Sequence, residues 1–232
     1  MPARILLALD TPDVATAVAQ TQAVGDAIDG VKLGLEFFIA NGPAGVVRVQ
    51  EEGLALFLDL KLHDIPNTVA GAVRSALGLN PLLVTVQAGG GPRMLRAAAD
   101  AAATGAPTRP LIIAVTVMTS LDDQDLMAVG QQPPVQDQVR RLAALAQAQG
   151  CDGVVCSAHE IATLRQDCGP DFRLVVPGLR PAAGDVGDQK RVMAPGEAAR
   201  LGADFLVIGR PITAAPDPAA AARLIRRGVA AA

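Results

Sequence analysis

The sequence predicts one closed (β/α)8 barrel, a TIM barrel, spanning residues 1–232. Eight short runs rich in leucine, valine and isoleucine alternate with eight alanine-rich amphipathic segments, and this alternation is typical of a parallel sheet covered by helices. The first run is followed by ALDTPD, which lacks the glycine fingerprint of an open dinucleotide-binding sheet. No linker rich in Pro, Gly and Ser divides the chain. The number of units and the chain length therefore favour a closed barrel over an open sheet.

The elements follow one another in strand–helix order. The expected strands are 4–9, 30–34, 55–61, 82–87, 111–117, 152–157, 172–177 and 204–209. The expected helices are 12–24, 36–52, 66–78, 91–103, 134–149, 158–167, 195–201 and 217–230, with an extra helical turn near 122–128.

Capping residues support several of these boundaries. Thr11-Pro12 predicts the start of the first helix, because proline is tolerated at the first helical position. Ser157 precedes Glu160 by the spacing of a capping box. Three glycines end helices just before strands: Gly53, Gly150 and Gly202.

Composition excludes several classes of function. The chain has 23 acidic and 20 basic residues and a net charge of −3, so it lacks the basic surface that binds nucleic acid or anionic membranes. No apolar stretch approaches the ~20 residues of a membrane span, and the first run is too short for a signal peptide. Three cysteines and two histidines make a Cys/His zinc site improbable. We expect a cytoplasmic protein with reduced thiols.

Polar residues gather where a barrel carries its function. Functional side chains of this fold lie at the carboxyl ends of the strands and in the loops that follow. Six of the expected strands end in or lead into such residues: Asp10, Lys32, Asp59, Lys61, Asp64, Thr119, Ser120, Arg180, Gln189 and Arg210. A barrel without a site has no need of so many polar groups on one face.

The third strand carries a pair of opposite charges. Asp59 and Lys61 are two residues apart, so their side chains point to the same side, while Leu58 and Leu60 face the helices. Lys32 on the neighbouring strand supplies a second cation. The pattern predicts a charge cluster in the mouth of the barrel.

A lysine between carboxylates keeps its proton. At ~4 Å each opposite charge is worth up to about 4 kcal/mol at an effective dielectric of 20, which favours the ammonium form of Lys61 between Asp59 and Asp64. This argues against a Schiff base or a general base and favours a proton donor. Asp64 lies beyond the strand, where a turn brings it back toward the lysine or directs it to a partner chain. The alternative is an ion-pair network in which these charges only neutralise one another and have no catalytic role.

The last two loops are typical of a phosphate site. Loops after strands seven and eight commonly bind phosphate in this fold. They hold Arg180, Gln189 and Arg210, with backbone amides at Gly178 and Gly209. Arginine suits bidentate phosphate recognition, so these loops predict a phosphorylated ligand.

Together these motifs resemble the orotidine 5′-phosphate decarboxylase family over essentially the whole chain. The similarity is carried, in the family's order, by VKLGLEFF, FLDLKLHDIPNT, LIIAVTVMTS, DGVVCSAHE, VVPGLRP, GDQKRVMAP and VIGRPIT. The D-x-K-x-x-D core alone also occurs in 3-keto-L-gulonate-6-phosphate decarboxylase and hexulose-6-phosphate synthase. Many relatives have histidine at the position of Gln87, which we do not expect to be catalytic.

The resemblance implies conversion of orotidine 5′-monophosphate to UMP and carbon dioxide, the last step of de novo UMP biosynthesis. Lys61 would protonate C6 of the pyrimidine, Asp59 would lie against the departing carboxylate, and Lys32 and Asp64 would complete the charge array. The implied substrate contacts are Asp10 and Lys32 at the ribose, Ser120 and Thr119 at the pyrimidine, Gln189 and Arg210 at the phosphate, and Pro177, Arg180 and Gly209 beside them.

The resemblance also implies a homodimer and the absence of any metal or organic cofactor. Asp64, Ile65 and Thr68 would reach the active site of the neighbouring subunit. Two alternatives stay open: a magnesium-dependent sugar-phosphate decarboxylase or aldolase of the same superfamily, and a non-catalytic barrel that binds phosphate.

Overall fold

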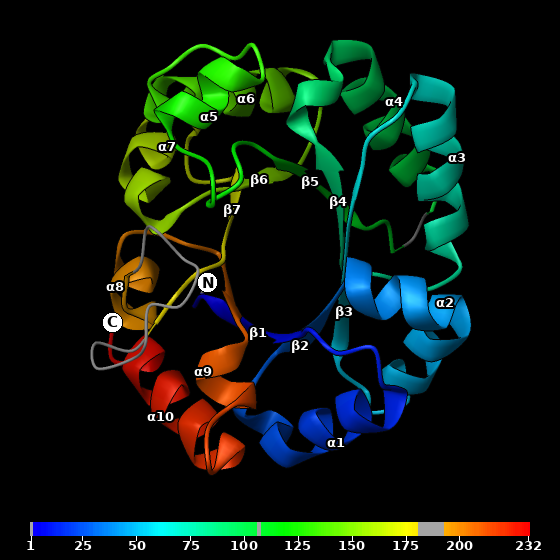
Figure 1. Ribbon diagram of the computed structural model, residues 1–232, viewed down its shortest axis with the longest axis vertical. Helices are drawn as coiled ribbons and strands as arrows, with labels where there is room; N and C mark the ends of the chain where they lie inside the picture. Colours follow the sequence, from blue (N-terminus) through cyan, green and yellow to red (C-terminus); the bar gives the residue numbers. More distant parts are fainter. Residues whose placement is uncertain (1, 106–107, 181–192) are drawn as a thin grey trace.

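The strands form a closed parallel barrel ringed by helices, as the sequence predicts (Figure 1). The computed structural model describes residues 2–105, 108–180 and 193–232. Each strand pairs with its neighbours in chain order, and β8 closes the barrel against β1. The strands are β1 (Arg4–Leu9), β2 (Gly30–Gly34), β3 (Ala55–Leu62), β4 (Leu83–Gln87), β5 (Leu111–Val115), β6 (Gly153–Val155), β7 (Arg173–Val176) and β8 (Phe205–Ile208).

Helices cover the outside of the barrel. They are α1 (Val14–Val24), α2 (Leu35–Gln50), α3 (Pro66–Leu77), α4 (Pro92–Ala103), α5 (Asp123–Ala128), α6 (Val135–Ala148), α7 (Ile161–Cys168), α8 (Pro195–Arg200), α9 (Arg210–Thr213) and α10 (Pro218–Ala230). Short 3-10 helices are η1 (Gly25–Ala27), η2 (Ala88–Gly90) and η3 (Ala158–Glu160). Within the parts of the chain that the structure describes, no helix has the length and apolarity to cross a membrane.

Local details differ from expectation at two helices. The first helix starts at Val14 and not at the predicted Pro12, because the Asp13 carboxylate accepts the Thr16 N–H at 2.6 Å and caps it. α2 is kinked at Gly42, whose φ is 57° and which precedes Pro43, a break that the amphipathic pattern did not predict.

The predicted caps at other helix ends are present. The Glu160 carboxylate accepts the Ser157 N–H at 2.7 Å, as in a capping box, although the helix opens as the 3-10 turn η3. The three predicted helix-ending glycines have positive φ, of 78° at Gly53, 83° at Gly150 and 103° at Gly202.

Two apolar layers hold the barrel. The inner layer consists only of strand residues and fills the barrel: Leu6, Ala8, Phe57, Leu83, Ile113, Val175, Phe205 and Val207. The outer layer packs the other faces of the strands against the helices and includes Leu58 and Leu60, as predicted. Burial of these side chains is the main favourable contribution to folding.

The inner face changes character along the strands. On β3, Phe57 belongs to the apolar layer, while Asp59 and Lys61 follow on the same face. On β4, Leu83 is followed by Thr85 in the same way. The barrel is therefore apolar inside and polar at its carboxyl-terminal mouth.

At the opposite, amino-terminal end of the barrel, three aspartates each join two neighbouring strands, and we call each such arrangement a lock. Each aspartate directly precedes an even-numbered strand and accepts a backbone N–H from the preceding odd-numbered strand. The pairs are Asp29 with Ile5 at 2.6 Å, Asp152 with Ile112 at 2.8 Å, and Asp204 with Leu174 at 2.8 Å. Arginines neutralise them: Arg226 at Asp29, Arg109 at Asp152, and Arg165 and Arg173 at Asp204.

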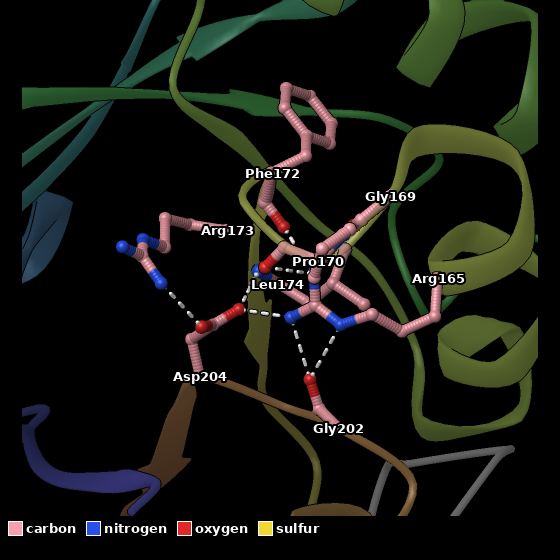
Figure 2. A network of polar contacts seen from close by, with 8 residues as sticks. All are labelled: Arg165, Gly169, Pro170, Phe172, Arg173, Leu174, Gly202 and Asp204. Atoms are coloured by element: carbon pink, nitrogen blue, oxygen red, sulfur yellow. Dashed lines mark hydrogen bonds and ion pairs between the residues drawn. The ribbon is translucent and has the colours of Figure 1, made fainter. Parts of the chain in front are cut away.

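Figure 2 shows the most extensive of these locks. Both Arg165 and Arg173 donate to the Asp204 carboxylate, Arg173 at 2.9 Å. Arg165 also donates to the Gly202 carbonyl at 2.7 Å and to the Phe172 carbonyl at 2.6 Å. One guanidinium thereby joins α7, the start of β7 and the loop before β8.

We expect Asp204→Ala to lower the free energy of unfolding by about 2–4 kcal/mol, because two arginines lose their carboxylate partner and the Leu174 N–H loses its acceptor. Asp167→Ala is the matched control: Asp167 also receives two hydrogen bonds from one arginine, Arg140, but that pair is exposed and solvent weakens it, so its loss should lower the free energy of unfolding much less. Urea denaturation measures both, and equal effects would contradict the role of the lock.

Candidate active site

Four charged side chains form a continuous chain of ion pairs at the mouth of the barrel. Lys61 Nζ lies 2.8 Å from Asp59 Oδ1, and Lys32 Nζ lies 3.5 Å from Asp59 Oδ2. Lys32 also lies 3.2 Å from Asp10 Oδ1. The predicted charge cluster of Lys32, Asp59 and Lys61 is present, and Asp10 extends it.

Asp59 is the least exposed member of this chain. Its side chain is 11% exposed, against 30% for Lys61 and 66% for Asp10. Burial raises the pKa of the Asp59 carboxyl, but the charges of Lys32 and Lys61, together with hydrogen bonds from Lys61 and Thr85, outweigh burial and hold the pKa below its ordinary value. Asp59 is thus an anion at neutral pH.

The backbone of β3 is irregular at Lys61. Leu58 pairs with Val84 and Leu62 pairs with Val86, so three residues of β3 lie opposite one residue of β4. Lys61 has a φ of 50°, in the left-handed region that a lysine rarely adopts and that costs roughly 1–3 kcal/mol. Such bulges occur next to active sites, where they redirect a side chain.

Thr85 is the single β4 residue opposite this bulge. Its side chain is fully buried; the hydroxyl oxygen accepts the Lys61 N–H at 2.9 Å, and the hydroxyl donates to Asp59 Oδ1 at 3.0 Å. Sequence reasoning missed this residue. The available signal was a threonine on the inner face of the apolar run LLVTVQ, two residues after Leu83.

Glycines let neighbouring strand ends approach these charges. A Cβ on Gly34 would lie 3.1 Å from Lys32 Nζ. A Cβ on Gly209, after β8, would lie 3.3 Å from Ala8 Cβ and 3.7 Å from Asp10 Oδ2. The predicted residues Gly209 and Asp10 are therefore neighbours where the barrel closes.

The turn after β3 points its polar groups outward. Asp64 is exposed, and its carboxylate accepts the Ile65 N–H at 2.6 Å. Within the described part of the chain, no ion pair joins Asp64 to Lys61. Ile65 and Thr68 are exposed as well. The structure places Asp64 at the surface and not beside the lysine of its own chain.

The other predicted substrate contacts follow β5, β7 and β8. After β5, Thr119 is half-buried and Ser120 is exposed. After β7, Pro177 is half-buried, and the Arg180 N–H donates to the Met193 carbonyl at 3.0 Å.

Residues predicted to hold phosphate are only partly placed. Gly209 directly precedes α9, and the exposed Arg210 is the first residue of that helix. Gln189 lies outside the described residues. Over the described ranges, no three His, Cys, Asp or Glu side chains are grouped closely enough to hold a metal ion.

The lowered pKa of Asp59 has a consequence for stability. A carboxyl whose pKa is lower in the folded chain than in the unfolded chain stabilises the fold above the unfolded value of about 4, and this contribution is lost as the pH falls through the folded pKa. We expect the free energy of unfolding of wild type to fall more steeply below about pH 4 than that of Asp59→Asn. Urea titrations between pH 3 and 6 measure the two slopes, and parallel slopes would contradict the expectation.

Comparisons with known proteins identify the family of this chain. The model of the Orotidine 5′-phosphate decarboxylase / HUMPS family matches residues 3–225. Proteins named orotidine 5′-phosphate decarboxylase from Paramagnetospirillum magneticum and Rhodospirillum rubrum are 52% and 55% identical, over 96% and 95% of this chain and 96% and 92% of their own lengths.

A solved structure is also similar. The crystal structure of orotidine 5′-phosphate decarboxylase from Lactobacillus acidophilus has a TM-score of 0.86 and 34% identity, over 98% of this chain and 99% of that one. Sequence and fold agree, and the chain belongs to the orotidine 5′-phosphate decarboxylase / HUMPS family.

Proposed function

We propose that this protein decarboxylates orotidine 5′-monophosphate to UMP and carbon dioxide, the final step of UMP biosynthesis. The observation that carries the proposal is the chain of alternating charges Lys32–Asp59–Lys61 at the barrel mouth. The relatives at 50–55% identity that are named for this activity support it over the sugar-phosphate reactions of the wider superfamily.

The proposed step needs only groups of the protein. The bond between C6 and the substrate carboxylate breaks, carbon dioxide leaves, and the electron pair stays on C6. The Lys61 ammonium gives C6 a proton, and solvent returns one to the lysine. A fixed ammonium aimed at the developing carbanion is a preorganised electrostatic catalyst. Asp59 forms an ion pair of 2.8 Å with the Lys61 ammonium and lies where the substrate carboxylate would be repelled, and the partner's Asp64 would complete the array.

The remaining residues would bind the substrate. We assign Asp10 and Lys32 to the ribose hydroxyls, Thr119 and Ser120 to the pyrimidine, and Gln189 and Arg210 to the phosphate, with Pro177, Arg180 and Gly209 beside them. Binding energy from the remote phosphate would hold the pyrimidine against the charged side chains of Lys32, Asp59 and Lys61. We propose that no metal or organic cofactor takes part.

The decisive experiment is a spectrophotometric assay of orotidine 5′-monophosphate. We expect wild type to consume it with formation of UMP, and Lys61→Ala to lower kcat by roughly 10³-fold or more, because the proton donor is lost. Arg140→Ala, which removes an exposed arginine on α6, is the control and should leave kcat unchanged. Absence of turnover by wild type would refute the proposal.

The same assay with EDTA separates the alternatives. Undiminished turnover supports a metal-independent reaction, whereas a requirement for Mg²⁺, with turnover of a sugar phosphate, would indicate the related enzymes. Nucleotide binding without turnover would indicate the non-catalytic alternative.

We further propose a homodimer in which Asp64, Ile65 and Thr68 complete the partner's site. Large apolar side chains are exposed after β2 and β3: Leu35 at 51%, Ile39 at 81% and Ile65 at 66%. Leu35 and Ile39 are four residues apart on α2 and so share one face of that helix, and exposed apolar side chains on one face are typical of an interface between subunits. The outward direction of the Asp64 turn fits this arrangement.

Hybrid dimers test the shared site. Lys61→Ala and Asp64→Ala chains, each inactive alone, should regain activity after mixing and subunit exchange. A twofold-symmetric dimer in a 1:1 mixture restores about a quarter of the sites, because only half the dimers are mixed and each of these has one intact site. Exchange is confirmed with differently tagged chains. Mixed dimers without activity would contradict a site built from both chains.

A further inference from the structure

Thr85 occupies the one place where β3 and β4 lose their regular pairing. Asp59, Leu60 and Lys61 lie between the paired residues of β3, and Thr85 alone lies between those of β4. A regular ladder would pair each β3 residue with one β4 residue. The Thr85 side chain lies where the ladder is interrupted.

The Thr85 hydroxyl binds both charged residues of the bulge. It accepts the Lys61 N–H at 2.9 Å and donates to Asp59 Oδ1 at 3.0 Å. The same oxygen, Asp59 Oδ1, also accepts a hydrogen bond from Lys61 Nζ at 2.8 Å. Thr85, Asp59 and Lys61 therefore form a closed ring of hydrogen bonds that fixes the backbone and the ammonium of Lys61 together.

We propose that Thr85 is a positioning residue of the decarboxylation site, which holds Lys61 in its left-handed backbone conformation and orients the Asp59 carboxylate toward both lysines. The inference deepens the proposed function and rests on the roles given there to Asp59 and Lys61. Thr85 acts through these two residues.

Packing alone does not require a hydroxyl at position 85. Leu83 on the same face is part of the apolar inner layer, and a valine of the same shape would fill the space of Thr85. Thr116, directly after β5, gives the contrast: it is also buried, but its hydroxyl donates to the Val155 carbonyl at 2.9 Å and, among the described residues, to no carboxylate.

The ionisation of Asp59 depends on groups from three strands. Lys32 faces it from β2, Lys61 from β3 and the Thr85 hydroxyl from β4, while Asp10 lies beyond Lys32. Loss of the hydroxyl removes one of the interactions that lower the pKa of Asp59 and leaves the raising effect of burial in place. On acidification, a reaction that needs ionised Asp59 then begins to lose its rate at a higher pH than in wild type.

The test compares Thr85→Val, Thr85→Ser and Thr116→Val. We expect Thr85→Val to lower kcat by about 10²-fold with KM within about threefold, because a misplaced donor affects the transition state more than ground-state binding. In its pH profile, the fall of kcat on the acid side (the acid limb) should move to higher pH. Thr85→Ser retains the hydroxyl and should recover most of kcat and the wild-type limb. Thr116→Val should lose stability but keep kcat within about threefold.

Two outcomes would overturn the inference: a Thr85→Val enzyme with the wild-type kcat and acid limb, or a Thr85→Ser enzyme as impaired as Thr85→Val. Should Thr85→Val fail to fold, Thr85→Cys replaces it, because a thiol fills similar space and hydrogen-bonds weakly.

Amide hydrogen exchange gives a readout that does not depend on turnover. The Lys61 N–H should lose protection in Thr85→Val and keep it in Thr85→Ser, with other β3 amides unchanged. Equal protection in both variants would show that Thr85 does not hold the bulge. Absence of turnover by wild type would instead refute the proposed function, and the exchange data would still decide whether Thr85 positions Lys61.

Discussion

Asp59 is the carboxylate on which the whole mouth of the barrel depends. A buried carboxylate is unfavourable unless opposite charges and hydrogen bonds surround it, and here Lys32, Lys61 and Thr85 supply them. The dependence is mutual, since without Asp59 two ammonium groups would face each other with no anion between them. β2, β3 and β4 must therefore lie in one particular register for the charges to balance. The order of charges along this edge of the barrel is as much a constraint on the fold as a feature of the site.

The two ends of the barrel have opposite roles in stability. At the mouth, the left-handed backbone of Lys61 is unfavourable, and the burial of Asp59 is unfavourable by itself, although Lys32, Lys61 and Thr85 outweigh it. At the other end, Asp29, Asp152 and Asp204 each join a pair of strands through a backbone N–H and an arginine. Between the two ends lies the apolar inner layer. Closure of the barrel thus depends on the apolar inner layer and on the aspartates at the amino-terminal end. The mouth can therefore hold strained and charged groups. This separation explains how one strand, β3, is part of the core at Phe57 and of the site only two residues later.

The sequence predicted what depends on local periodicity and left out what depends on register between strands. Alternation of apolar runs and amphipathic segments was sufficient for the closed barrel, and the two-residue spacing was sufficient to pair Asp59 with Lys61. The bulge could not be foreseen, because the pattern of β3 alone does not record which residue of β4 lies opposite it, and Thr85 was missed for the same reason. The lock between Asp29 and Arg226 joins residues from opposite ends of the chain, and no spacing rule connects them.

The bulge also explains how Lys61 can be bound to Asp59 and still act as an acid. An ammonium has three N–H donors, and the bond to Asp59 Oδ1 uses one, so a donor remains for the reacting carbon even when a second carboxylate binds another. The proton donor therefore does not have to leave its carboxylate to reach the substrate, provided that the side chain enters the mouth from a suitable direction. That direction is determined by the backbone of Lys61, whose left-handed φ departs from a regular strand. In the proposed reaction, the strain in β3 is then a cost of folding that places the ammonium before the substrate arrives, which is the condition for electrostatic preorganisation.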